Sequence, residues 1–215
     1  MSEQRTPPAA IPAGVAIRRR RPLLDLAARR ARPGSGSSIE TLMTRSWRDP
    51  DLHLRQVRTP FAIVGGVATA LYMPLRLTLD LDLLVIADDA PALHAELVGL
   101  GCRQVGTLAI GGTTWETPGM YRVDLIESTA PWAVAAVQHP RRSPTDLPVI
   151  DLPFLSLMKL ESSRAQDIAD LSRMLGAADG PTVDRVRAAV LAYRPDDAED
   201  LESLIALGRL EFQAP

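Results

Sequence analysis

Two aspartates, Asp80 and Asp82, are the residues whose type and spacing best suit chemistry. They lie two positions apart in an apolar stretch that predicts a strand over 78–86, and alternate side chains of a strand share a face. The same face is expected to carry Arg76 and Thr78, whereas leucines fill the other face. Because Asp is depleted in strands, this pair favours a metal site over a strand whose polar side merely faces water.

A third carboxylate, Asp124, lies in the alternating stretch 120–127, which predicts another strand. Mg²⁺ or Mn²⁺ prefers hard oxygen ligands, so the candidate metal ligands are Asp80, Asp82 and Asp124. Metal ions held in this way stabilise the attacking and leaving oxygens of a phosphoryl displacement, and a carboxylate can accept the proton of the attacking hydroxyl. For Asp124 alone, a structural role is an equally open interpretation.

Two glycines, Gly65 and Gly66, separate a predicted strand from a predicted helix just before the aspartate pair. Without Cβ atoms the backbone can approach a phosphate closely, and the start of a helix offers free N–H groups. The pattern is neither the dinucleotide-binding fingerprint nor a P-loop. An ordinary tight turn is the alternative, and the pair becomes a candidate phosphate cradle only through its place before the aspartates.

A single lysine, Lys159, stands among 24 basic residues, which suggests a position that Arg cannot fill. A surface Lys with a packed stem is the alternative. Shortly after it, Asp167 and Asp170 are three residues apart and therefore neighbours on one helix face. These aspartates either pair with Arg164 or Arg173 or contribute to the same cleft as Lys159.

The elements that must position these residues are strands in the first half and helices in the second. The patterns predict strands over 61–64, 78–86, 103–110, 113–117 and 120–127, and helices over 67–72, 91–100, 153–163, 166–175, 181–193 and 197–208. This order indicates an α+β fold with a helical C-terminal part. We expect a basic, flexible arm over 1–38, a core over 39–150, and a helical region over 151–215 that completes the cleft.

Charge and composition limit the classes of function. Residues 1–59 hold 12 Arg and five acidic residues, whereas the remainder holds 12 basic and 21 acidic residues. The basic portion either contacts RNA, DNA or an acidic partner or is a solvated arm. One cysteine excludes an intrachain disulfide and a cysteine zinc cluster. No apolar run suits a membrane span or a signal peptide, so we expect a cytoplasmic protein with no membrane partner.

The segment GGVATALYMPLRLTLDLDLLV resembles the nucleotidyltransferase-fold proteins, whose signature is a Gly-Gly or Gly-Ser pair, a helix, and Asp-x-Asp on a strand. Its Arg-x-Thr-x-Asp-x-Asp form is most similar to the AbiEii-type toxin and toxin-like group. The later segment MKLESSRAQDIADLSRML is similar to that group's downstream motif. The resemblance covers about residues 61–175, and Met73-Pro74 replaces the Gly often found before the Arg.

The resemblance implies a small mixed sheet flanked by helices and a role for each matching residue. Asp80 and Asp82 would bind magnesium, with Asp124 as a less secure third carboxylate, and Asp167 would lie near the acceptor or the metal. The nucleotide-binding residues would be Gly65, Gly66, Arg76, Thr78, Lys159 and Arg164, of which Lys159 would contact the triphosphate.

The implied activity is transfer of a nucleoside monophosphate from an NTP to a hydroxyl acceptor with release of pyrophosphate. The resemblance makes an RNA such as tRNA, or a protein, the expected acceptor, and an antitoxin the expected partner of a toxin. A non-catalytic, nucleotide- or partner-binding member of the same fold is the alternative. A nucleic-acid-binding module that works through the Arg-rich arm is a third interpretation.

Overall fold

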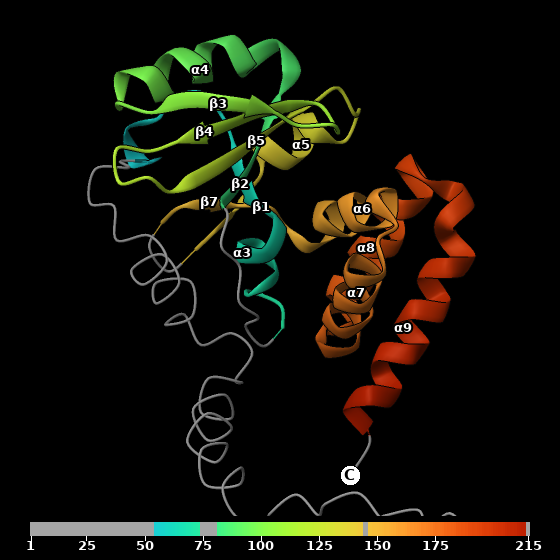
Figure 1. Ribbon diagram of the computed structural model, residues 1–215. Coiled ribbons are helices and arrows are strands. Elements are labelled where there is room, and N and C mark those ends of the chain that lie inside the picture. The colour runs from blue at the N-terminus through green and yellow to red at the C-terminus, as the bar shows by residue number, and fades with distance from the viewer. Residues whose placement is uncertain (1–53, 74–80, 144–145, 214–215) are drawn as a thin grey trace, which may run out of the picture.

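A mixed sheet forms the centre of the computed structural model, which describes residues 54–73, 81–143 and 146–213 (Figure 1). The described strands lie in the order β3-β4-β5-β2-β1-β7-β6. Their bounds are Ala62–Val64 (β1), Leu81–Ile86 (β2), Arg103–Thr107 (β3), Gly112–Glu116 (β4), Arg122–Ser128 (β5), Arg141–Arg142 (β6) and Pro148–Val149 (β7). β2 is parallel to β5 and β1 is parallel to β7, whereas the other neighbours are antiparallel.

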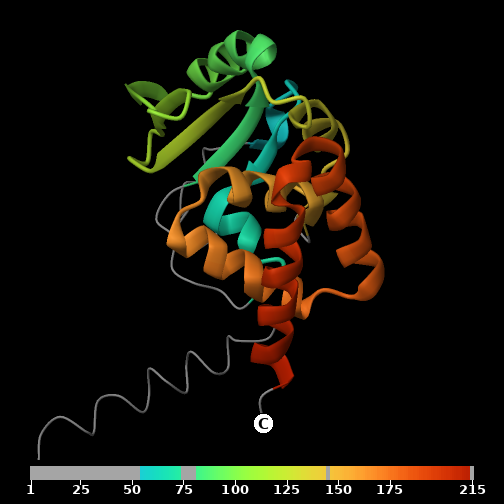
Figure 2. The same ribbon diagram turned by 90° about the vertical axis from the view of Figure 1, so that its right-hand side faces the viewer.

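Helices cover the sheet from both sides. The α-helices of the described residues are Gly65–Thr69 (α3), Ala90–Gly99 (α4), Ala133–Gln138 (α5), Leu152–Ser162 (α6), Ala165–Ala177 (α7), Gly180–Tyr193 (α8) and Ala198–Gln213 (α9). Short 3₁₀ turns occupy Leu54–Gln56 (η1), Ala87–Asp89 (η2) and Pro195–Asp197 (η3). α4 lies over one face of the sheet, and α3 and the helices from α6 onward lie on the opposite side (Figures 1 and 2).

Of the two central parallel strands, β2 buries apolar residues on both faces, whereas β5 buries them on one face. Leu81, Leu83 and Leu84 of β2 are completely buried, as are Val123 and Leu125 of β5. Parallel strands covered by helices on both sides are expected to be apolar throughout. The sequence predicted one apolar and one polar face for the second strand, whereas the structure buries residues on both faces, so a carboxylate there stands in apolar surroundings.

The C-terminal helices form a packed layer of their own. Asp151 caps the start of α6 and Asp179 caps the start of α8, each by accepting a backbone N–H. α7 lies along α9, where Gly176 and Gly208 bring the two backbones together. Within the described ranges, none of the helices has the length and apolarity that crossing a bilayer requires.

The α+β architecture with a helical C-terminal part is confirmed, and several element bounds differ from those predicted. The first helix includes Gly65-Gly66 instead of following them. The strand predicted from Met120 begins at Arg122, because Met120 adopts a left-handed φ of 62° in the turn before it. Helix α5 and the two-residue strands β6 and β7 were not predicted. The arm predicted over 1–38 lies outside the described residues.

Candidate active site

Asp82 and Asp124 lie side by side at the centre of the sheet. Asp82 is on β2 and Asp124 is its register partner on the parallel strand β5. On the other side of β2, Asp82 is the register partner of Val64, the last residue of β1. Register partners of parallel strands point to the same face, and both aspartates line one cavity. The structure therefore brings together two carboxylates that are 42 positions apart in the sequence.

The Asp124 carboxylate has an oxygen that makes no hydrogen bond with a polar group of the described protein. Its Oδ1 atom is buried and has no hydrogen-bond partner. Among the described residues, no other buried side-chain nitrogen or oxygen lacks a partner. Burying a polar atom without a partner is costly, and burying a charged one is more so. An oxygen kept in this state beside a second carboxylate fits a site that is completed by a cation.

Gly65 holds the start of α3 against Asp82. Its φ of 61° lies in the left-handed region, which favours glycine. A Cβ atom built at this position would lie 1.8 Å from Asp82 Oδ2, so no other residue fits without displacing the carboxylate. Gly65 lines the cavity, whereas Gly66 is buried and is not among the lining residues. The first glycine thus brings the backbone close to the Asp82 carboxylate, and the approach to a phosphate predicted for the glycine pair stays a prediction.

The opposite wall of the cavity centres on Lys159, which is 4% exposed. Its Nζ donates to Asp167 Oδ1 at 2.8 Å and to Asp170 Oδ2 at 3.2 Å. Arg164 Nε also donates to Asp167, at 2.8 Å to Oδ2, and Ser162 Oγ donates to the same oxygen at 2.7 Å. Both alternatives for the aspartates hold in part, because Asp167 pairs with Arg164 and also lies in the cavity with Lys159. Lys159 is not a surface residue.

These contacts set the protonation of Asp167. Burial favours the neutral carboxyl, but the hydrogen bonds from Lys159 and Ser162, the positive charge of Lys159 and the hydrogen bond from Arg164 outweigh it. The pKa of Asp167 is therefore held below its ordinary value. Lys159, Arg164, Asp167 and Asp170 together form a cluster with no net formal charge.

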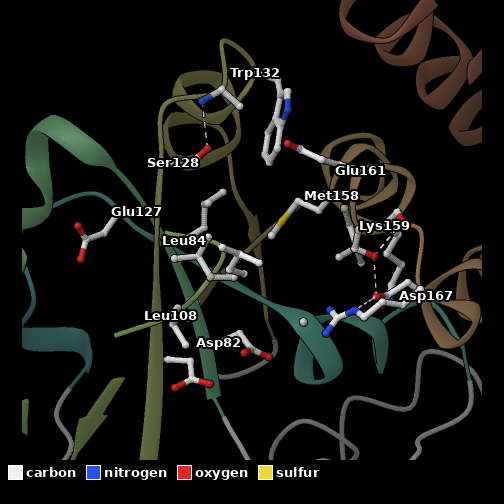
Figure 3. Close-up of a pocket in the computed structure, with 18 of the residues that line it drawn as sticks. Asp82, Leu84, Leu108, Glu127, Ser128, Trp132, Met158, Lys159, Glu161 and Asp167 are labelled. Carbon is white, nitrogen blue, oxygen red and sulfur yellow. Dashed lines mark hydrogen bonds and ion pairs between the residues drawn. The ribbon is translucent and has the colours of Figure 1, made fainter. Parts of the chain in front are cut away.

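The cavity between these two walls has a volume of about 660 Å³, within the range typical of small-molecule sites. Figure 3 shows Asp82 on one side and Lys159 and Asp167 on the other, with Leu84 and Met158 farther along. Arg164 is 76% exposed and also lines the cavity, so part of its guanidinium remains open to a ligand.

Three predicted site residues, Asp80, Arg76 and Thr78, lie outside the described residues. In the described ranges, no group of three or more His, Cys, Asp and Glu side chains is placed to hold a metal ion. Asp82 and Asp124 supply two carboxylates, and Asp80 is the third member of the predicted set.

Sequence reasoning missed the cavity residues Trp132, Met158 and Glu161. Trp132 and Glu161 occupy no motif position in the sequence. Helical spacing was the available signal, because Glu161 and Ser162 follow Met158 on α6 at three- and four-residue intervals.

No protein-family model matches the chain, and no curated protein matches it significantly. Two structures of the antibiotic-resistance factor ANT(2″)-Ia align with it. A solution structure described as revealing substrate-regulated conformation dynamics has a TM-score of 0.39 and 17% identity, over 81% of this chain and 91% of that chain. A crystal structure in complex with adenylyl-2″-tobramycin has a TM-score of 0.36 and 19% identity, over 82% and 95%. Likeness at this level assigns no activity.

Proposed function

We propose that the protein is a nucleotidyltransferase that moves a nucleoside monophosphate from an NTP to a hydroxyl acceptor and uses Mg²⁺ or Mn²⁺. The observation that carries the proposal is the pairing of Asp82 with Asp124, whose buried Oδ1 has no partner. Hard carboxylate oxygens beside a small-molecule cavity suit these cations. Asp80, Asp82 and Asp124 would hold the cation, which would neutralise negative charge on the phosphoryl oxygens.

The remaining residues would bind and orient the nucleotide. Gly65 would keep the backbone at the start of α3 close to Asp82, and therefore close to a phosphate bound there. Arg164 is the exposed cation of the opposite wall and would contact the triphosphate. Lys159, which is buried and held by two aspartates, would act mainly by fixing Asp167 and the ends of α6 and α7 around the cavity.

At the α-phosphorus, the reaction forms one P–O bond and breaks another. The acceptor oxygen attacks the α-phosphorus, the bond from that phosphorus to the bridging oxygen of the β-phosphate breaks, and pyrophosphate leaves with the bonding electrons. The acceptor's proton would pass to the Asp124 carboxylate, which has a second oxygen besides the one that would bind the cation. The acceptor class, RNA such as tRNA or a protein, is supported by the sequence resemblance alone, as are the toxin role and an antitoxin partner.

Incubation with each labelled NTP, magnesium, and either total RNA or total protein tests this function. We expect label to be transferred to one acceptor class, and transfer to be lost in Asp82→Ala and Asp124→Ala and on chelation of the metal. Glu199→Gln, on the exposed surface of α9, serves as the control and should keep full transfer. Absence of both transfer and magnesium-dependent NTP binding would contradict the proposal.

A further inference from the structure

The cavity continues past the carboxylates to a second end, formed by Trp132 and Glu161. Between the ends its walls are apolar, with Leu84 and Ile126 from the sheet and Met158 from α6. Figure 3 shows Leu84 and Met158 lying between Asp82 and Trp132. The cavity is therefore polar at the sheet centre, apolar in its middle, and polar again at its far end.

Glu161 is the carboxylate at that far end whose oxygens are free to accept hydrogen bonds from a ligand. It lies in the last turn of α6, and in Figure 3 its carboxylate points toward the Trp132 side chain. Within the described ranges, Glu161 makes no hydrogen bond or ion pair. Glu127 differs, because its Oε1 lies 2.9 Å from His94 Nε2 and accepts a hydrogen bond from Thr113.

The character of this end fits a nucleobase better than a phosphate. An unpaired carboxylate repels phosphate, and the cations that line the cavity, Lys159 and Arg164, contact Asp167 and not Glu161. A flat heterocycle presents apolar faces to side chains such as Leu84 and Met158 and places its polar groups at its edge. Aromatic side chains add favourable stacking or edge contacts with such rings.

We propose that Trp132 and Glu161 form the nucleobase subsite and that Glu161 selects bases with an exocyclic amino group. This inference rests on the proposed function, since it assumes that the cavity holds an NTP. An ionised carboxylate only accepts hydrogen bonds. Adenine, cytosine and guanine each offer an amino donor, whereas uracil has a carbonyl oxygen where cytosine has its amino group. Uracil therefore brings two acceptors together.

Equilibrium binding of CTP and UTP, measured in magnesium without any acceptor, tests this selectivity. The two nucleotides form a matched pair that differs at this edge. We expect CTP to bind about tenfold more tightly, the lower end of what one hydrogen bond to a charged group contributes. In Glu161→Gln the ratio should fall toward one, because a carboxamide donates as well as accepts. ATP and ITP form a second pair with the same amino-for-carbonyl exchange.

The controls separate this inference from the proposed function. Glu199→Gln removes a surface charge on α9, at a residue that does not line the cavity. It should leave the ratio of CTP affinity to UTP affinity unchanged. Equal binding of CTP and UTP by the unaltered protein, or an unchanged ratio in Glu161→Gln, would overturn the base subsite and leave the transferase proposal standing. Failure to bind any NTP would overturn both.

Discussion

The Lys159 side chain and the Oδ1 atom of Asp124 are both buried, but they differ in their hydrogen bonds. Lys159 is satisfied within the protein by two carboxylates. Asp124 Oδ1 is buried and unsatisfied. A charge buried without a partner lowers stability, and such groups concentrate at functional sites. The difference supports the proposed roles, in which Lys159 orders the wall of the site and Asp124 binds the cation.

Asp124→Asn should separate stability from activity. A neutral amide is less costly to bury than an unpaired carboxylate, so the free energy of unfolding without metal should rise by roughly 1 kcal/mol. Transfer should fall by about 100-fold or more, since the ligand and proton acceptor is lost. Chemical denaturation and turnover assays measure the two effects. A loss of stability like that of a core substitution would contradict the ligand role.

The ion pairs of Asp167 should make folding stability depend on pH. The folded pKa lies below the unfolded value of about 4. The contribution is therefore fully present above that pH and is lost as pH falls through the folded pKa. Between pH 6 and pH 3 the unaltered protein should lose more unfolding free energy than Asp167→Asn. Asp200→Asn, at an exposed position of α9, should follow the unaltered protein.

At the scale of elements, the crossing of α7 and α9 depends on glycine. A Cβ atom on Gly208 would lie 1.9 Å from the Ser172 carbonyl oxygen, and one on Gly176 would lie 2.4 Å from Gly208. Ser172 Oγ also donates to the Leu204 carbonyl at 3.1 Å, so the two helices are joined by backbone contact as well as by apolar packing.

Gly208→Ala should therefore lower the unfolding free energy by about 1–3 kcal/mol, because the helices must move apart. Gly99→Ala is the matched control. A Cβ at Gly99 meets nothing within 4 Å, and alanine suits a helix better by roughly 0.5–1 kcal/mol. Thermal unfolding of both variants gives the comparison, and equal effects would show that the crossing tolerates a methyl group.

Local signals predicted the elements well where they were strong. Asp179, Gly180 and Pro181 mark the start of α8, and the alternating apolar pattern locates β5. The strand β7 has two residues, too few to show an alternating apolar pattern. It is a strand because it pairs with β1 and β6.

The candidate site was predictable as a set of residue types but not as an arrangement. The aspartates, the glycine and the lysine stood out by type and spacing. The partners of Lys159 and the role of Glu161 follow from how α6 and α7 pack on the sheet. Such contacts are set by tertiary structure, and local patterns do not encode them.

At the scale of the whole molecule, the charged residues that line the cavity are mostly acidic, whereas those of the segment 1–38 are mostly basic. The cavity has five lining carboxylates and two cations. Residues 1–38 hold eight Arg and two acidic residues. Attraction of a polyanionic acceptor would therefore come from the arm, since arginine contacts to phosphates give affinity that is independent of sequence.

Deletion of residues 1–38 tests this division. NTP binding should persist, whereas RNA affinity should fall and its dependence on salt should weaken, because fewer counterions are released. Binding of a labelled RNA across a salt series, beside NTP binding, measures both. Loss of NTP binding in the deletion variant would show that the arm belongs to the nucleotide site, and unchanged RNA affinity would remove its role in RNA contact.

The two walls of the cavity come from successive parts of the polypeptide, and this sets when the site can exist during synthesis. The carboxylate wall is complete once β5 has left the ribosome, but Lys159, Arg164 and Asp167 emerge more than 30 residues after Asp124. A chain interrupted between these points has the proposed metal ligands without the opposite wall. We therefore expect translation products that end before α7 to bind no nucleotide. Nucleotide binding should appear only after α7 has been made.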